Sequence, residues 1–193
     1  MRLPEIERGD TLRTRMLIRF ISAVSGVRLP DAARVAFYHK GFAGPALGAW
    51  TQAVMRGPSE WTVGERELMA AMVANWNSCT FCVGAHRAVA VTGIDPAVVD
   101  ACLADYRTAP VSDSLRATLA FLEALTRHPD AVNAEDVRAA IAAGVTRDQL
   151  ADASAVAAVF NIITRYADAL DFAIPTDADF AKAATMMLKR GYA

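Results

Sequence analysis

Two cysteines and a histidine have the clearest potential for chemistry in this sequence. Cys79, Cys82 and His86 lie within one stretch of eight residues. An α-helix advances about 100° per residue, so the three side chains would fall within about 60° of one another on one face. Cysteines three residues apart in a helix have Cα atoms roughly 5–5.5 Å apart, a separation that a disulfide tolerates. The spacing therefore indicates a redox-active dithiol.

The surroundings of the dithiol favour a reactive thiol. Asn77 and Ser78 are expected to cap a helix over residues 79–92. Unpaired N–H groups at a helix N-terminus favour an anion, so a thiol there is expected to have a lowered pKa. His86, one turn after Cys82, can accept the thiol proton directly or through water.

A carboxylate on the preceding helix completes the candidate set. Thr62 and Glu65 have the spacing of a capping box, which is a sufficient structural role for Glu65. Glu67 instead adjoins an apolar run that starts at Leu68, and a carboxylate near a core is costly unless something uses it. Beside a thiol and an imidazole, burial would raise its pKa towards neutrality and let it pass protons.

Two structural alternatives remain open for the cysteine pair. In the first, the two thiols are small buried hydrophobic groups with no chemical role. The C-x-x-C-x-x-x-H pattern also offers three zinc ligands, although a structural zinc site needs a fourth and no second cluster of this kind follows in the sequence. Cys102 lies among Val98, Val99 and Leu103 and is predicted to be a small core residue.

Composition excludes several classes of protein. Hydrophobic residues make up 54% of the 193 residues and charged residues 21%, which is unlike a disordered chain. The formal net charge of −1 gives no excess of positive charge for binding nucleic acid or anionic lipid. No run reaches the about 20 apolar residues of a membrane span, and no signal peptide is recognisable. With its paired cysteines, the chain is expected in the reducing cytoplasm.

The elements that position these residues are predicted to be helices. Apolar residues recur at helical spacing almost throughout, and no segment has the alternation of a strand. The expected fold is all-α, in one domain over residues 1–193. We expect helices over residues 11–24, 30–38, 45–55, 62–75, 79–92, 95–103, 113–127, 133–142, 146–171 and 177–189.

Glu67, Cys79, Cys82 and His86 together form the pattern E-x11-C-x-x-C-x-x-x-H. This pattern resembles the peroxidase-related branch of the alkylhydroperoxidase D-like (AhpD-like) family, the dithiol branch of the carboxymuconolactone decarboxylase superfamily. Segments 143–150 and 160–170 also resemble that branch, so the resemblance covers about residues 35–175. It implies an all-α fold that assembles through helix packing into a homo-oligomer, a trimer or hexamer.

The resemblance also implies a reaction and a role for each residue. Cys82 would attack a hydroperoxide, and Cys79 would resolve the product to a disulfide, with Glu67 and His86 as the proton relay. The helix-terminus argument alone favours Cys79 as the attacking thiol, and here we follow the family. An external dithiol or a peroxiredoxin-type partner would reset the pair. Because both electrons come from the thiols, no flavin, haem or metal is required.

One residue departs from the family pattern. Founding members have a histidine immediately before the second cysteine, where this sequence has Phe81. The substitution removes one proton-relay group, which puts efficient peroxidase activity in doubt but leaves dithiol exchange possible. A non-enzymatic redox sensor or adaptor, whose oligomeric state or contacts respond to the dithiol, is therefore an alternative, and a zinc site is a lesser one.

Overall fold

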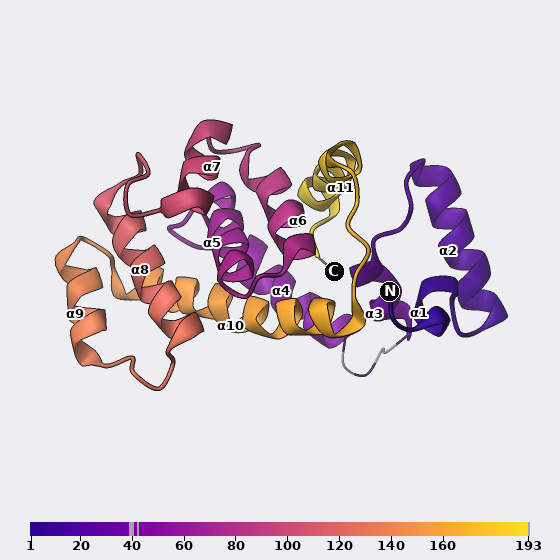
Figure 1. The fold of residues 1–193 in the computed structure, drawn as a ribbon, viewed down its shortest axis with the longest axis horizontal. Helices are drawn as coiled ribbons and strands as arrows, with labels where there is room; N and C mark the ends of the chain where they lie inside the picture. Colours follow the sequence, from indigo (N-terminus) through magenta and orange to yellow (C-terminus); the bar gives the residue numbers. More distant parts are fainter. Residues whose placement is uncertain (39–40, 42, 193) are drawn as a thin grey trace.

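The computed structural model describes residues 1–38, 41 and 43–192, and within these residues it is all-helical with no strand (Figure 1). The predicted all-α fold is confirmed. The helices are α1 (Pro4–Arg8), α2 (Leu12–Ser25), α3 (Asp31–Tyr38), α4 (Pro45–Arg56), α5 (Val63–Trp76), α6 (Thr80–Ala90), α7 (Pro96–Asp105), α8 (Asp113–Arg127), α9 (Ala134–Ala142), α10 (Arg147–Leu170) and α11 (Asp177–Arg190).

Local side-chain caps explain where several helices begin. Thr62 accepts a hydrogen bond from the backbone N–H of Glu65, and Glu65 accepts one from the backbone N–H of Thr62, so the predicted capping box of α5 is confirmed. Thr146 and Gln149 form the same arrangement at the start of α10. These caps involve residues close in sequence, which is why the sequence predicts them well.

Helix α5 lies at the centre of the fold and is buried on every side. Ten of its 14 residues are buried. Helices α4, α6, α7, α8 and α10 all pack against it. In Figure 1, α10 runs along one side of the molecule beneath α5 and α6, with α8 and α9 at one end. Cys102 is fully buried in the core cluster around α5, as predicted.

A second hydrophobic cluster joins the N-terminal helices to the C-terminal segment. The buried side chains around the two cysteines come from α1, α3, α5, α6, the end of α10 and α11: Ile6, Val35, Ala74, Phe81, Ala167, Phe172 and Phe180. Buried Asp31 links the two ends, since its carboxylate accepts a hydrogen bond of 2.7 Å from the backbone N–H of Ala173. The first and last parts of the chain therefore enclose the dithiol together.

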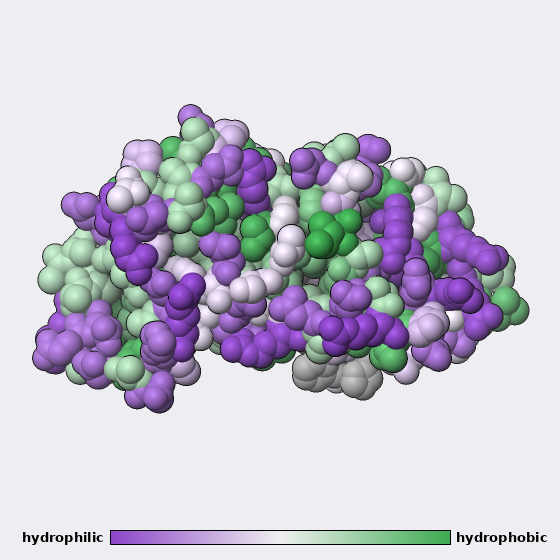
Figure 2. Space-filling model, viewed as in Figure 1, coloured by the Kyte–Doolittle hydropathy of each residue, from purple (hydrophilic) through white to green (hydrophobic). Residues whose placement is uncertain are grey.

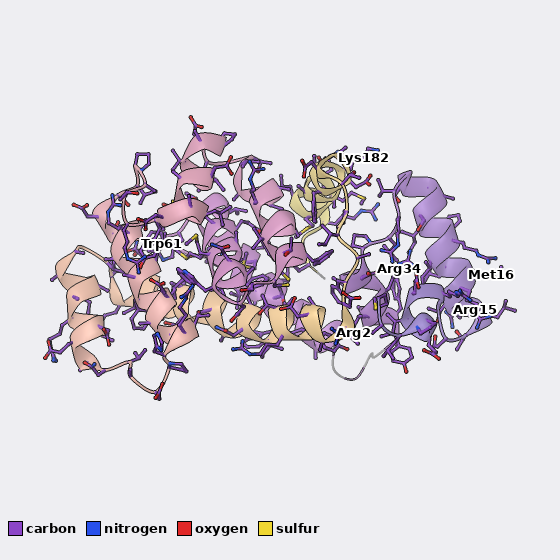
Figure 3. The ribbon with its side chains drawn as sticks, viewed as in Figure 1. Arg2, Arg15, Met16, Arg34, Trp61 and Lys182 are labelled. Carbon is purple, nitrogen blue, oxygen red and sulfur yellow. The ribbon has the colours of Figure 1, made fainter. Side chains whose placement is uncertain are left out.

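Helix α2 exposes an apolar stripe at one end of the molecule. Leu12, Met16, Phe20 and Val24, spaced four residues apart, are each more than 60% exposed. Figure 3 shows Met16 on the side of α2 that faces away from the other helices. Figure 2 shows a further strongly hydrophobic patch near the middle of the face in view, close to α6 and α11. Among the described residues, no helix combines the length and apolar character needed to cross a membrane.

Candidate active site

The turn between α5 and α6 is held by the neighbouring helix. The side-chain amide of Asn77 donates to Asn161 Oδ1 at 3.0 Å and to Thr164 Oγ1 at 2.9 Å, both on α10. Ser78 adopts a φ of 61°, a left-handed conformation that is unfavourable for residues other than glycine. These contacts with α10 compensate for the strain and fix the start of α6.

The prediction that Asn77 and Ser78 cap α6 is wrong. Cys79 occupies the N-cap position, and no side chain caps the helix. Asn77 ends α5 instead, and its side chain is engaged with α10. The backbone N–H of Cys79 is satisfied by the carbonyl of Ala74 at 2.9 Å. The helix therefore begins directly at the first cysteine.

Both thiols are free and fully buried. Cys79 is 0% exposed and Cys82 is 1% exposed. The hydrogen bond between the two thiols, burial, and the charge of Asp168 all raise the pKa of Cys82 well above that of an ordinary cysteine. The lowered pKa expected of a thiol at the start of the helix does not extend to Cys82, which lies one turn further on. The resting residue is a protected thiol, and its activation requires a base.

Glu67 on α5 and His86 on α6 form a buried pair, and His86 lies one turn after Cys82. Glu67 Oε2 lies 2.7 Å from His86 Nδ1, and the two residues are 0% and 4% exposed. The imidazole also packs edge-to-face on Phe160, with the ring centroids 4.3 Å apart. A carboxylate can only accept hydrogen bonds, so Nδ1 carries a proton, and in the neutral imidazole Nε2 is then the acceptor.

Glu67 is also held by two residues that the sequence patterns do not identify. Arg56 on α4 forms an ion pair with Glu67 Oε1 at 2.6 Å. The hydroxyl of Tyr192, beyond α11, donates to the same oxygen at 2.8 Å. The Arg56 guanidinium also lies 5.0 Å from the centre of the Tyr192 ring. Neither residue belongs to a motif, and nothing in their spacing relative to Glu67 points to the contact.

The ionisation of Glu67 differs from the sequence-based expectation. Burial by itself would raise the pKa of Glu67, but the hydrogen bond to His86 and the charges of His86 and Arg56 outweigh it and lower the pKa below the usual value. The expectation of a pKa near neutrality is therefore wrong. Glu67 is a fixed anion at neutral pH, suited to orienting His86 rather than to exchanging protons itself.

Comparison with known proteins identifies the fold that carries this site. No protein-family model matches the sequence, and no curated protein matches it. Among solved structures, the chain resembles the alkylhydroperoxidase AhpD core of an uncharacterized peroxidase-related protein from Ralstonia eutropha JMP134, with 25% identity, a TM-score of 0.75 and coverage of 93% of this chain and 94% of that one. The chain therefore has an AhpD-like fold.

Two other solved structures have the same fold. An uncharacterized peroxidase-related protein from Silicibacter sp. TM1040 aligns with a TM-score of 0.76 and 23% identity over 93% of each chain. The debrominase Bmp8 aligns with a TM-score of 0.70 and 17% identity over 91% of this chain and 94% of its own. A cysteine-to-alanine variant of Bmp8 has been solved with 2,3,4-tribromopyrrole. The AhpD-like fold therefore occurs in proteins described by different activities.

Within this AhpD-like fold, α11 covers the helix that carries the cysteines. Phe81 packs edge-to-face on Phe172 with the ring centroids 5.2 Å apart, and its centroid lies 6.1 Å from that of Phe180. A Cβ atom on Gly84 would lie 2.5 Å from the Phe180 ring. Glycine at this position lets α11 approach α6 closely, and the aromatic cluster excludes water from the thiols.

We expect Gly84→Ala to loosen this cover. The added methyl overlaps the Phe180 ring, and such overpacking costs typically 1–3 kcal/mol, less up to about 1 kcal/mol that alanine gains in a helix. The free energy of unfolding in denaturant should fall, and a thiol reagent should label the cysteines faster than in the wild type. Gly93→Ala is the matched control, because the nearest atom to its Cβ would be 3.6 Å away. Unchanged stability and labelling in Gly84→Ala would show that the Phe180 ring moves aside at no cost and would contradict this prediction.

A zinc site would need several ligand side chains gathered at one place. Within the part of the chain that the structure describes, no group of three or more histidine, cysteine, aspartate or glutamate residues is arranged to hold a metal ion. The Nδ1 atom of His86 is engaged with Glu67. Metal analysis of untagged protein is the direct test of this alternative.

Proposed function

We propose that this AhpD-like chain is a thiol-dependent peroxidase that reduces hydroperoxides with the Cys79–Cys82 pair. One observation carries the proposal. Two buried thiols lie at the start of α6, one turn before a histidine that a buried carboxylate holds at 2.7 Å. The peroxidase-related proteins that share the fold add support at the level of the family.

Activation of Cys82 is the first step of the proposed reaction. Its pKa is raised by Cys79 and by burial, so very little thiolate exists at neutral pH. With Nδ1 donating to Glu67, Nε2 of His86 is the free base and takes the thiol proton directly or through one water. The Glu67 anion then stabilises the imidazolium that forms.

Two bond exchanges follow. The Cys82 thiolate attacks one oxygen of the hydroperoxide, the O–O bond breaks, and the products are a Cys82 sulfenic acid and an alcohol, which receives a proton. The Cys79 thiol then attacks the Cys82 sulfur, forming the disulfide and releasing water. The two thiols are oxidised by two electrons and the peroxide is reduced by two, so no metal or organic cofactor enters the reaction.

An external reductant must complete the cycle. A dithiol or a peroxiredoxin-type protein would reduce the Cys79–Cys82 disulfide by thiol–disulfide exchange. We propose that the protein works in a reducing compartment, of which the cytoplasm is the default. The test is peroxide consumption by the reduced protein with dithiothreitol in excess, using hydrogen peroxide and tert-butyl hydroperoxide. Consumption no faster than with dithiothreitol alone would contradict the proposed function.

A redox-dependent adaptor is the second candidate. The observation in its favour is that helices from both ends of the chain cover the thiols, so a disulfide could alter the surface that they form. We also propose a homo-oligomer, for which the exposed apolar stripe of α2 offers a contact surface for a second copy. Light scattering during gel filtration, with and without reductant, measures the mass of both states. A mass that changes with the thiol state, without peroxide consumption, would favour the adaptor.

A further inference from the structure

The chain beyond α11 returns to the buried carboxylate of the site. Gly191 adopts a φ of 72°, in the left-handed region that suits glycine, and turns the chain inwards. The backbone N–H of Tyr192 then donates to Gln52 Oε1 at 2.7 Å. A Cβ atom on Gly191 would lie 2.1 Å from that same oxygen, so the turn and its anchor fit together closely.

The Tyr192 side chain is placed to act on the Glu67–His86 pair. Its hydroxyl lies 2.8 Å from Glu67 Oε1 and 3.4 Å from His86 Nδ1. Its ring is stacked near that of His86, with centroids 6.4 Å apart. Burial and the neighbouring Glu67 charge raise the pKa of Tyr192 well above its ordinary value, so the phenol remains a proton donor throughout the working range of pH.

The two oxygens of Glu67 have separate partners. Oε1 receives the Tyr192 hydroxyl and the Arg56 charge, while Oε2 receives His86 Nδ1. The terminal torsion of a glutamate side chain is soft, and by itself it does not fix the plane of the carboxylate. The Tyr192 hydroxyl and the Arg56 cation on Oε1 fix that plane and direct Oε2 at Nδ1.

We propose that Tyr192 is a positioning residue of the dithiol site: its hydroxyl fixes the Glu67 carboxylate so that His86 keeps the tautomer with a free Nε2. This inference rests on the proposed function in one respect, namely that His86 deprotonates Cys82. The charged and titratable groups that interact with the cluster or with the thiols are Arg56 on α4, Arg66 and Glu67 on α5, Cys79, Cys82 and His86 on α6, and Asp168 on α10.

Tyr192→Phe tests the proposal because it removes only the hydroxyl. The ring that packs against Arg56 is retained. With reduced protein, the rate of Cys82 alkylation by iodoacetamide should fall about tenfold at neutral pH, the effect expected for losing one hydrogen bond to a charged group. The loss should disappear at alkaline pH, where hydroxide forms the thiolate without His86. Nitrogen NMR of the His86 ring should change from one tautomer to a mixture.

Tyr106→Phe is the matched control. The Tyr106 hydroxyl also donates to a glutamate, Glu123 Oε2, at 2.8 Å, but it belongs to the main core. Its removal should leave the alkylation rate and the His86 tautomer unchanged. Melting curves establish that both variants are folded at the assay temperature.

Other outcomes of the Tyr192→Phe experiment separate the two proposals. An equal loss of rate at every pH would show that the Tyr192 hydroxyl is only a structural contact. A faster reaction at every pH would show that Tyr192 only restricts access to the thiols. Either result would overturn the positioning role. So would an unchanged tautomer with an unchanged pH profile. A wild type that consumes no peroxide, with the Tyr192→Phe effects present, would overturn the peroxidase function and leave the positioning role standing.

Discussion

Cys82→Ser is expected to abolish peroxide turnover completely. Serine retains the size of the side chain but cannot form a sulfenic acid or a disulfide, so neither proposed bond exchange can take place. Peroxide consumption in the presence of dithiothreitol measures the loss. Cys102→Ser makes the same chemical change in the main core, and its turnover should be retained even if its stability falls. Residual turnover in Cys82→Ser would contradict the assignment.

Cys79→Ser distinguishes the two possible orders of attack. If Cys82 attacks first, this variant should consume one equivalent of peroxide and stop with a sulfenic acid on Cys82, which dimedone traps. Cys82→Ser should then consume none. The reverse pattern, with a trapped sulfenic acid on Cys79 in Cys82→Ser, would assign the attack to the residue at the N-cap of α6.

His86→Ala and Glu67→Gln should each slow oxidation of the dithiol by roughly 10²-fold at neutral pH, the usual contribution of a positioned base. The raised pKa of Cys82 makes this dependence strong, because little thiolate forms without the base. As the pH rises, hydroxide replaces His86 and the gap between variant and wild type should close. Stopped-flow measurement of single-turnover oxidation across pH gives both quantities.

Glu67→Gln carries a cost in stability that has to be separated from its effect on rate. Glutamine leaves the Arg56 cation without its counter-charge, and breaking a buried pair costs about 3–5 kcal/mol. Since the pKa of Glu67 is lowered in the folded state, the stabilisation is present above the ordinary glutamate pKa and is lost as pH falls through the lowered value. The neutral and alkaline range is therefore suitable for comparing rates.

Glu123→Gln is the matched control for that substitution. Glu123 likewise accepts a hydrogen bond from a tyrosine and pairs with an arginine, but it lies on α8, against the turn after α7, rather than at the dithiol. Its oxidation rate should equal that of the wild type. Equal rates in the wild type, His86→Ala and Glu67→Gln would contradict the proposed base.

The features that the sequence predicts well are local ones. The Thr62–Glu65 capping box and the run of Cys79, Cys82 and His86 on one helix depend on residues at most seven apart, so helical periodicity is sufficient. The contact of Glu67 with His86 spans 19 residues and was expected from the family pattern alone. The structure places those two side chains in direct contact.

The features that were missed depend on contacts that only the folded chain creates. Tyr192 reaches Glu67 across 125 residues, and Arg56 reaches it from a different helix. Arg56, together with His86, decides the ionisation of Glu67, so burial alone gives the wrong direction for its pKa. The cap of α6 was wrong for a similar reason, because Asn77 has better partners on α10 than on its own turn.

The most direct test of the dithiol chemistry is mass spectrometry of reduced protein after one equivalent of tert-butyl hydroperoxide. The peptide that holds Cys79 and Cys82 should lose two hydrogens and resist alkylation until a reductant is added, while Cys102 remains a free thiol. A peptide that still carries two alkylatable thiols after this treatment would contradict the central claim that these cysteines are a redox pair.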